Sequence, residues 1–171
     1  MTNAPEGPRR LDIELLALDL DTCGRCTGTA ANLDDALASV AGVLREAGVE
    51  VGVDKTVVRT REEAERLRFS SSPTIRVTGR DIALELRESS CADCGSLCGC
   101  EGGVDCRVWV WRGREYTEAP KAMIVDAVLR AYAAAGSPAP DETYRMPDNL
   151  RRFFDAKRPE RASCCGGGAA R

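Results

Sequence analysis

The residues best suited to chemistry are two cysteines near the start of the chain. Cys23 and Cys26 are separated by two residues and follow an apolar stretch at residues 11–18. This spacing brings both sulfurs within reach of each other in a turn, so that one thiolate can attack a disulfide and the second thiol can release the mixed disulfide. The pair therefore indicates thiol–disulfide exchange. Half of a zinc site has the same spacing, and the sequence leaves that alternative open.

Charged residues around this pair act in opposite directions. Arg25 lies between the two cysteines, and a helix that begins nearby would add the positive end of its dipole. Both favour the thiolate form. Asp19 and Asp21 are close in sequence and could instead raise the thiol pKa or accept a proton. The net effect on the pair stays open at the level of sequence.

A second group of cysteines lies in the glycine-rich segment 88–106, with the spacing C-x2-C-x3-C-x-C-x5-C. Four such thiolates can wrap a tetrahedral ion without a preformed scaffold, and zinc is the first choice, followed by an iron–sulfur cluster. A reduced flexible loop, a set of local disulfides and a second redox dithiol are the alternatives. The candidate metal ligands are Cys91, Cys94, Cys98, Cys100 and Cys106.

A third group is the adjacent pair Cys164 and Cys165, which precedes three glycines near the end of the chain. Neighbouring thiols rarely pair with each other, because a ring between them strains the disulfide. They do chelate soft ions such as mercury or trivalent arsenic. The pair is therefore a candidate metal site on a mobile tail, with an incidental exposed tail as the alternative.

Composition narrows the classes of function. The 171 residues carry a net charge of -3, with 43% hydrophobic and 30% charged residues, as in an ordinary soluble globular protein. The acidic balance argues against nucleic acid or an anionic membrane as a partner. No run approaches the roughly 20 apolar residues of a membrane span, and the polar N-terminus does not read as a signal peptide, so we expect a cytoplasmic protein.

Cysteine and histidine usage is more specific. The chain has nine cysteines and no histidine. Cytoplasmic thiols stay reduced, so clusters of them bind metal or perform redox work more often than they form structural disulfides. The absence of histidine excludes Cys-His hydrolases and any zinc site with an imidazole ligand.

The pattern of apolar residues predicts alternating strands and helices. A helix that ends at Gly48 begins either near Asn32, as an N-cap, or earlier; a start at Asn32 would leave Cys26 in a preceding turn. Segment 88–106 is too rich in glycine for regular structure. We predict strands at 11–20, 49–58, 74–77 and 82–86, helices at 60–69 and 119–135, and a hairpin of strands 107–111 and 115–118.

These elements suggest one domain with additions at both ends. Residues 1–10 are expected to be a disordered leader, and residues 11–135 a domain with the cysteine-rich insertion 88–106. Residues 136–171 form a C-terminal extension that ends in the Cys-Cys tail. Within this extension, Leu150, Phe153 and Phe154 are spaced as in a small amphipathic helix.

Three motifs carry a resemblance to a known family, namely Cys23-Gly24-Arg25-Cys26, Ser72-Pro73-Thr74 and Val104-Asp105-Cys106-Arg107-Val108-Trp109. Over residues 11–135 the chain resembles the thioredoxin superfamily, and more narrowly a group of small bacterial and archaeal thioredoxin-like proteins. The resemblance implies an α/β thioredoxin-like fold, in which a βαβ unit is joined to a β-hairpin and a final helix, here with a cysteine-rich loop insertion.

The resemblance also implies roles at the first cysteine pair. Cys23, as the more exposed thiol, would attack and Cys26 would resolve, while Pro73, if its peptide bond is cis, would present backbone to a bound partner. The chain departs from thioredoxin proper at Thr22, where that family has tryptophan, and at Arg25, where it has proline. These departures favour a dedicated partner over general disulfide reduction.

The sequence thus predicts a cytosolic thiol–disulfide oxidoreductase that uses Cys23 and Cys26, with Pro73 and Arg25 as further site residues. Its substrate would be a protein thiol or disulfide partner, or a thiophilic metal or metalloid. The alternative is a non-enzymatic protein that binds or carries a soft ion such as zinc, mercury or arsenic.

Overall fold

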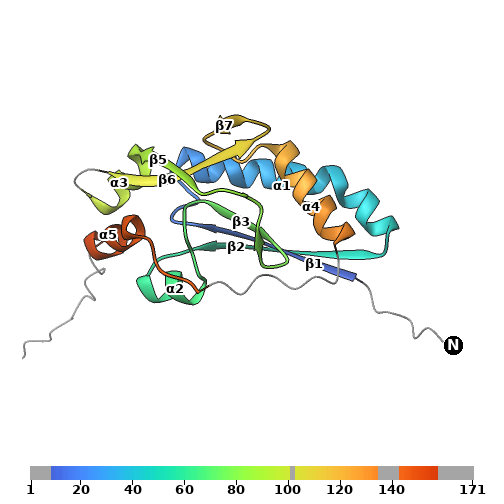
Figure 1. The fold of residues 1–171 in the computed structure, drawn as a ribbon, viewed down its shortest axis with the longest axis horizontal. Helices are drawn as coiled ribbons and strands as arrows, with labels where there is room; N and C mark the ends of the chain where they lie inside the picture. The colour runs from blue at the N-terminus through green and yellow to red at the C-terminus, as the bar shows by residue number, and fades with distance from the viewer. Residues whose placement is uncertain (1–8, 101–102, 135–142, 158–171) are drawn as a thin grey trace, which may run out of the picture.

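Five helices and two sheets form the part of the chain that the computed structural model describes, residues 9–100, 103–134 and 143–157 (Figure 1). The strands are β1 (Arg9–Ala17), β2 (Val49–Val57), β3 (Thr74–Val77), β4 (Arg80–Asp81), β5 (Arg87–Cys91), β6 (Val104–Trp111) and β7 (Arg114–Tyr116). The helices are α1 (Gly24–Glu46), α2 (Arg61–Arg66), α3 (Ala92–Cys98), α4 (Lys121–Ala133) and α5 (Asp148–Ala156).

The larger sheet has the strand order β2-β1-β3-β4. β1 pairs in parallel with β2 and antiparallel with β3. Parallel neighbours need a crossover connection, and α1 supplies it. α1 packs against α4 on one side of this sheet, as Figure 1 shows. The predicted strand-helix-strand unit and the later helix are therefore confirmed, and the mixed α/β architecture agrees with a thioredoxin-like fold class.

The smaller sheet has the order β5-β6-β7, and the predicted hairpin is its β6-β7 pair. Arg107 of β6 joins the two sheets. Its backbone N–H donates to the carbonyl of Ser72 at 2.7 Å, and its buried guanidinium makes an ion pair of 2.8 Å with the partly exposed carboxylate of Asp81. These contacts hold the loop before β3 against β6.

The start of α1 answers a question that the sequence left open. Cys23 is the N-cap residue of α1, so Cys26 lies in the first turn of the helix, well before Asn32. The helix ends at Glu46, and Gly48 follows with a φ of 71°, a left-handed conformation that glycine adopts at low cost. The predicted helix at 60–69 is also present, shorter, with Thr60 accepting a hydrogen bond from the backbone of Glu63.

Two predictions about irregular and extended segments were wrong. Residues 82–86 are not a strand; the strand after β3 is β4, which follows a tight turn in which Thr78 and Gly79 have φ values of 50° and 77°. Segment 88–106 is not irregular, because it contains β5, α3 and the start of β6. Gly95 lies within α3, whereas Gly99, with a φ of 64° just after α3, and Gly103, with a φ of 78°, adopt left-handed conformations outside it.

The ends of the chain also differ in part from expectation. β1 begins at Arg9, so the last two residues of the predicted leader belong to the sheet. The predicted amphipathic helix around Leu150 and Phe153 is confirmed as α5. Residues 1–8 and the Cys164-Cys165 tail lie outside the described residues. No helix within the described ranges is long and apolar enough to cross a membrane.

The buried side chains form two apolar clusters. The first lies between the larger sheet and helices α1 and α4. The second lies at the end of the molecule where α3, α5 and the start of α1 come together, and Figure 1 shows α3 and α5 there. This second cluster contains five free cysteines, and it places the first two cysteine groups of the sequence in one core.

Candidate metal centre

The turn before α1 positions the first cysteine pair. The carboxylate of Asp19 accepts hydrogen bonds from the backbone N–H groups of Thr22, at 2.7 Å, and Cys23, at 2.6 Å. Partial burial of Asp19 opposes its ionisation, but the hydrogen bonds from Cys23 and Thr22 outweigh it and hold the pKa of Asp19 below its usual value. Asp19 therefore fixes the turn as a charged acceptor, and its carboxylate contacts backbone instead of a thiol.

The smaller sheet and α3 position the second pair. Cys91 is the last residue of β5 and the N-cap of α3, and Cys94 lies in the first turn of that helix. Asp93 of α3 accepts a hydrogen bond of 2.9 Å from the backbone N–H of Gly24, the first residue of α1. This contact joins the start of α1 to the start of α3, so that the two C-x-x-C motifs face each other.

Three sulfur atoms from these motifs lie close together. The Sγ of Cys23 is 3.9 Å from the Sγ of Cys91 and 3.7 Å from that of Cys94, and all three lie within 4.8 Å of one another. Thiolates bound to zinc at about 2.3 Å stand about 3.8 Å apart in a tetrahedron. The two measured distances agree with that edge, so the sulfur positions fit one soft ion.

Two further thiols flank this triad. The Sγ of Cys26 lies 3.4 Å from the hydroxyl oxygen of Ser72, which itself accepts a hydrogen bond from the backbone of Leu18. Cys106 lies on β6, where it pairs with Ser89 of β5. We call Cys23, Cys26, Cys91, Cys94 and Cys106 the thiol cluster; each is at most 4% exposed.

Burial and mutual contact make these thiols weak acids. The hydrogen bond between Cys26 and Cys23 and the burial of the group raise the pKa of Cys23 to about 12. At Cys26 the contact with Cys23 lowers the pKa, but the contact with Cys94 and burial raise it, to a net value of about 12. The pKa of Cys94 is raised too, through its contacts with Cys106 and Cys23. Without a bound cation, Cys23, Cys26 and Cys94 therefore keep their protons at pH 7.

Arg25 lies against the backbone that carries the second pair. Its guanidinium donates to the carbonyl oxygen of Ser90 at 2.8 Å, to the hydroxyl of Ser89 at 3.0 Å and to the carbonyl of Cys106 at 3.4 Å. These acceptors belong to β5 and β6, next to Cys91. Arg25 thus ties α1 to the smaller sheet and brings a positive charge beside the cluster, which favours bound thiolates.

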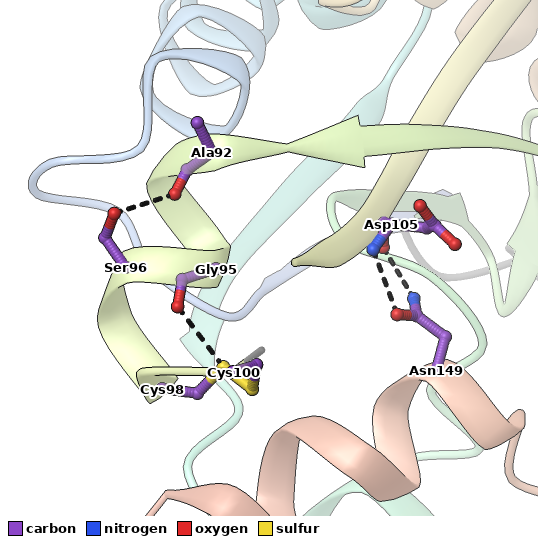
Figure 2. The surroundings of a disulfide bond; sticks show 7 residues. All are labelled: Ala92, Gly95, Ser96, Cys98, Cys100, Asp105 and Asn149. Carbon is purple, nitrogen blue, oxygen red and sulfur yellow. Dashed lines mark hydrogen bonds between the residues drawn. A yellow bond between two sulfur atoms is a disulfide. The ribbon is translucent and has the colours of Figure 1, made fainter. Parts of the chain in front are cut away.

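Two predictions about the roles of individual cysteines were wrong: the exposure of Cys23, and the place of Cys98 and Cys100 among the metal ligands. Cys23 is not the exposed thiol of its pair, because both Cys23 and Cys26 are fully buried. Cys98 and Cys100 do not join the thiol cluster; they are bonded to each other as a disulfide at the end of α3, and a disulfide sulfur is not a thiolate ligand (Figure 2).

The structure describes the positions of Pro73 and of three cysteines of the second group, but not those of the C-terminal pair. The Ser72–Pro73 peptide bond is cis, and Ser72 sets Pro73 beside Cys26. The structure brings Cys91, Cys94 and Cys106 together with the first pair. Cys164 and Cys165 lie outside the described residues, so their place relative to the cluster stays a prediction.

Sequence reasoning missed the residues that assemble the site. It treated the two C-x-x-C motifs as separate centres, although their equal spacing and their position just before a helix were shared signals. The hydrogen bond from the backbone of Gly24 to Asp93, which joins the two motifs, has no signal in the sequence. Asn149 of α5 was also missed; it exchanges two hydrogen bonds, of 2.9 and 2.6 Å, with the backbone of Asp105, next to Cys106 (Figure 2).

The fold and the site define a mixed α/β protein with a buried cluster of thiols contributed by three segments of the chain. The chain belongs to the family described as Domain of unknown function (DUF2703), which matches residues 11–128. None of the curated proteins and none of the solved structures matches this chain. The family match includes every residue of the thiol cluster and ends before α5.

Proposed function

We propose that this protein binds a soft, thiophilic metal ion in the thiol cluster, with Cys23, Cys91 and Cys94 as its core ligands. The observation that carries the proposal is the approach of the Cys23 sulfur to those of Cys91 and Cys94, at 3.9 and 3.7 Å. Zinc is the first candidate ion by its preference for four thiolates, and mercury or trivalent arsenic would suit the same donors.

The fourth thiolate would come from Cys26 or Cys106. Both are buried beside the triad: Cys26 is in contact with Cys23 and Cys94, and Cys106 is in contact with Cys94 and Cys91. A tetrahedral ion takes four ligands, and the thiol cluster offers five, one more than the ion can bind. The surplus would let ligands exchange without exposing the ion to water, which suits a protein that takes up and releases its ion.

Charge supports a bound cation. Buried thiols with pKa values of about 12 at Cys23 and Cys26 are poor nucleophiles at pH 7, because the thiolate is the reactive form. A soft cation would replace their protons and leave the sulfurs as thiolates. The guanidinium of Arg25 and the start of α1 would then offset part of the remaining negative charge.

Thiol–disulfide exchange is the second candidate function. It is favoured by the same 3.7 Å contact, which sets Cys94 of one C-x-x-C motif against Cys23 of the other. In that reading the two motifs would pass a disulfide between them, and Ser72 and Pro73 would face the partner. Burial of Cys23 requires a local opening before any external disulfide could react.

The test is a titration of the reduced, chelator-treated protein with zinc in competition with a chromophoric chelator. We expect one equivalent of zinc per chain. Cys23→Ser should weaken binding by more than about tenfold, because even the loss of a partner outside the ligand sphere typically costs about 10–100-fold in metal affinity.

The matched control is the double variant Cys98→Ser, Cys100→Ser, which removes two cysteines that lie outside the thiol cluster and should retain the affinity of the wild type. The metal proposal fails if the wild type takes up no stoichiometric ion, or if Cys23→Ser binds zinc within twofold of the wild type. Disulfide reductase activity that Cys23→Ser abolishes, in protein that binds no zinc, would establish the second candidate instead.

A further inference from the structure

A second cysteine site lies outside the thiol cluster, at the end of α3. Cys98 and Cys100 form a disulfide, and both residues are partly exposed. A cavity of about 390 Å³ lies against it, lined by Cys100, Gly103 and three residues of α5. The buried cysteines of the cluster are not part of that lining. Reagents in solution therefore meet the Cys98–Cys100 disulfide before they meet any cluster thiol.

The two charged residues of the cavity differ in their partners. Arg152 and Asp155 of α5 line it together with Ala156. Asp155 is engaged by an ion pair with Arg61. Arg152 is exposed and makes no ion pair with the residues that the structure describes. A carboxylate in the cavity would find this guanidinium as its partner.

The two sulfurs of the disulfide differ in their surroundings. Cys100 lines the cavity, whereas the Sγ of Cys98 lies on the helix side, 3.5 Å from the carbonyl oxygen of Gly95 (Figure 2). That carbonyl can accept a hydrogen bond from a thiol at Cys98. Attack at Cys100, with Cys98 as the leaving sulfur, is the favoured direction because Cys100 is the sulfur that lines the cavity. The carbonyl of Gly95 becomes a hydrogen-bond partner of Cys98 only after the released thiolate has taken up a proton.

We propose that the Cys98–Cys100 disulfide is a redox site that reacts with a low-molecular-weight thiol bearing a carboxylate, held by Arg152. The thiolate of the first thiol molecule attacks the Sγ of Cys100, the bond between Cys98 and Cys100 breaks, and Cys98 leaves as a thiolate that takes a proton from water. A second thiol molecule attacks the bound thiol's sulfur and releases Cys100. In sum, two thiols are oxidised to one disulfide, and the protein disulfide is reduced to two thiols.

The experiment uses the full chain purified without reductant and treated with glutathione, a tripeptide thiol with free carboxylates. The reaction is stopped with acid and an alkylating reagent, and peptide mapping locates the mixed disulfide. We expect it at Cys100, with Cys98 alkylated. Arg152→Gln should slow the reaction with glutathione by about threefold, the size typical of an exposed charge pair, and leave the reaction with uncharged 2-mercaptoethanol unchanged.

Arg45→Gln, an exposed substitution near the far end of α1, is the matched control and should leave both rates unchanged. Three results would overturn the proposal: Cys98 and Cys100 alkylated as free thiols before glutathione is added, a mixed disulfide found mainly at Cys98, or equal slowing of both thiols by Arg152→Gln. The inference does not depend on metal binding, because Cys98 and Cys100 lie outside the thiol cluster.

Discussion

Cysteine side chains in the thiol cluster have lost their contact with water, and this governs their acid–base behaviour. Burial and contact with other thiols raise the pKa values of Cys23 and Cys26 to about 12, whereas an ordinary cysteine thiol has a pKa of 9.0. A raised folded pKa means that folding favours the protonated form. The stability that these groups contribute is therefore complete below about pH 9 and is lost as the pH rises toward 12.

This predicts a stability that falls with pH in metal-free protein. Urea unfolding of the reduced protein, with a chelator present, should show the free energy of unfolding declining between pH 9 and pH 11. The double variant Cys23→Ser, Cys26→Ser should show a shallower decline, because serine does not titrate in this range. A decline of equal slope in both proteins would show that other groups are responsible.

Residue types predicted part of this chemistry. The nine cysteines and the missing histidine excluded any metal site with an imidazole ligand, and the spacing of Cys23 and Cys26 indicated that they act as a pair. The exposure of Cys23 could not be predicted, because it depends on Cys91 and Cys94, which lie far along the chain. The spacing of cysteines predicts contacts only between residues that are close in the sequence. The 3.7 Å contact between the sulfurs of Cys94 and Cys23 joins residues that are 71 positions apart.

At the scale of elements, α5 covers the thiol cluster. Leu150 and Phe153 are fully buried in the same apolar cluster as the cysteines. Asn149 anchors the helix through its two hydrogen bonds to the backbone of Asp105, one residue before Cys106. The helix lies beyond the residues matched by the family.

We therefore expect Asn149→Ala to open the cluster. Each hydrogen bond contributes about 1 kcal/mol, so the loss of two should raise the population of open molecules, and with it the alkylation rate of the cluster thiols, by about thirtyfold. Pulsed alkylation with peptide mapping measures this rate in metal-free protein.

Asn32→Ala is the control for this experiment. Asn32 of α1 donates to the carbonyl of Ala119 at 3.0 Å, near the other apolar cluster. Its loss should leave alkylation of the cluster thiols unchanged. Equal rates in Asn149→Ala and the wild type would mean that α5 does not control access.

Elements with a clear periodicity were predicted well, and those built by tertiary contacts were not. β3 was predicted with its observed bounds, because Ile75 and Val77 alternate with polar residues directly after Pro73. β5 escaped notice, because its residues Ser89 and Ser90 carry no alternating pattern and become a strand only by pairing with β6. The cysteine-rich segment is thus ordered by its partner strand, and not by its own propensity.

At the scale of the whole molecule, the thiols are part of the core. One apolar cluster fills the space between the larger sheet and helices α1 and α4, and the other consists in part of cysteine sulfurs. A bound ion would therefore hold β5, α3 and the start of α1 together. Its loss would destabilise the part of the molecule that is built on the second apolar cluster.

The most direct test of this account is the 13Cβ chemical shift of each cysteine, measured by NMR on reduced protein before and after one equivalent of zinc. These shifts distinguish a thiol, a zinc-bound thiolate and a disulfide sulfur at each residue. The account predicts that Cys23, Cys91 and Cys94 change together to the values of zinc-bound thiolates. If Cys91 and Cys94 change while Cys23 keeps the shift of a free thiol, or if none of the three changes, the shared metal centre is contradicted.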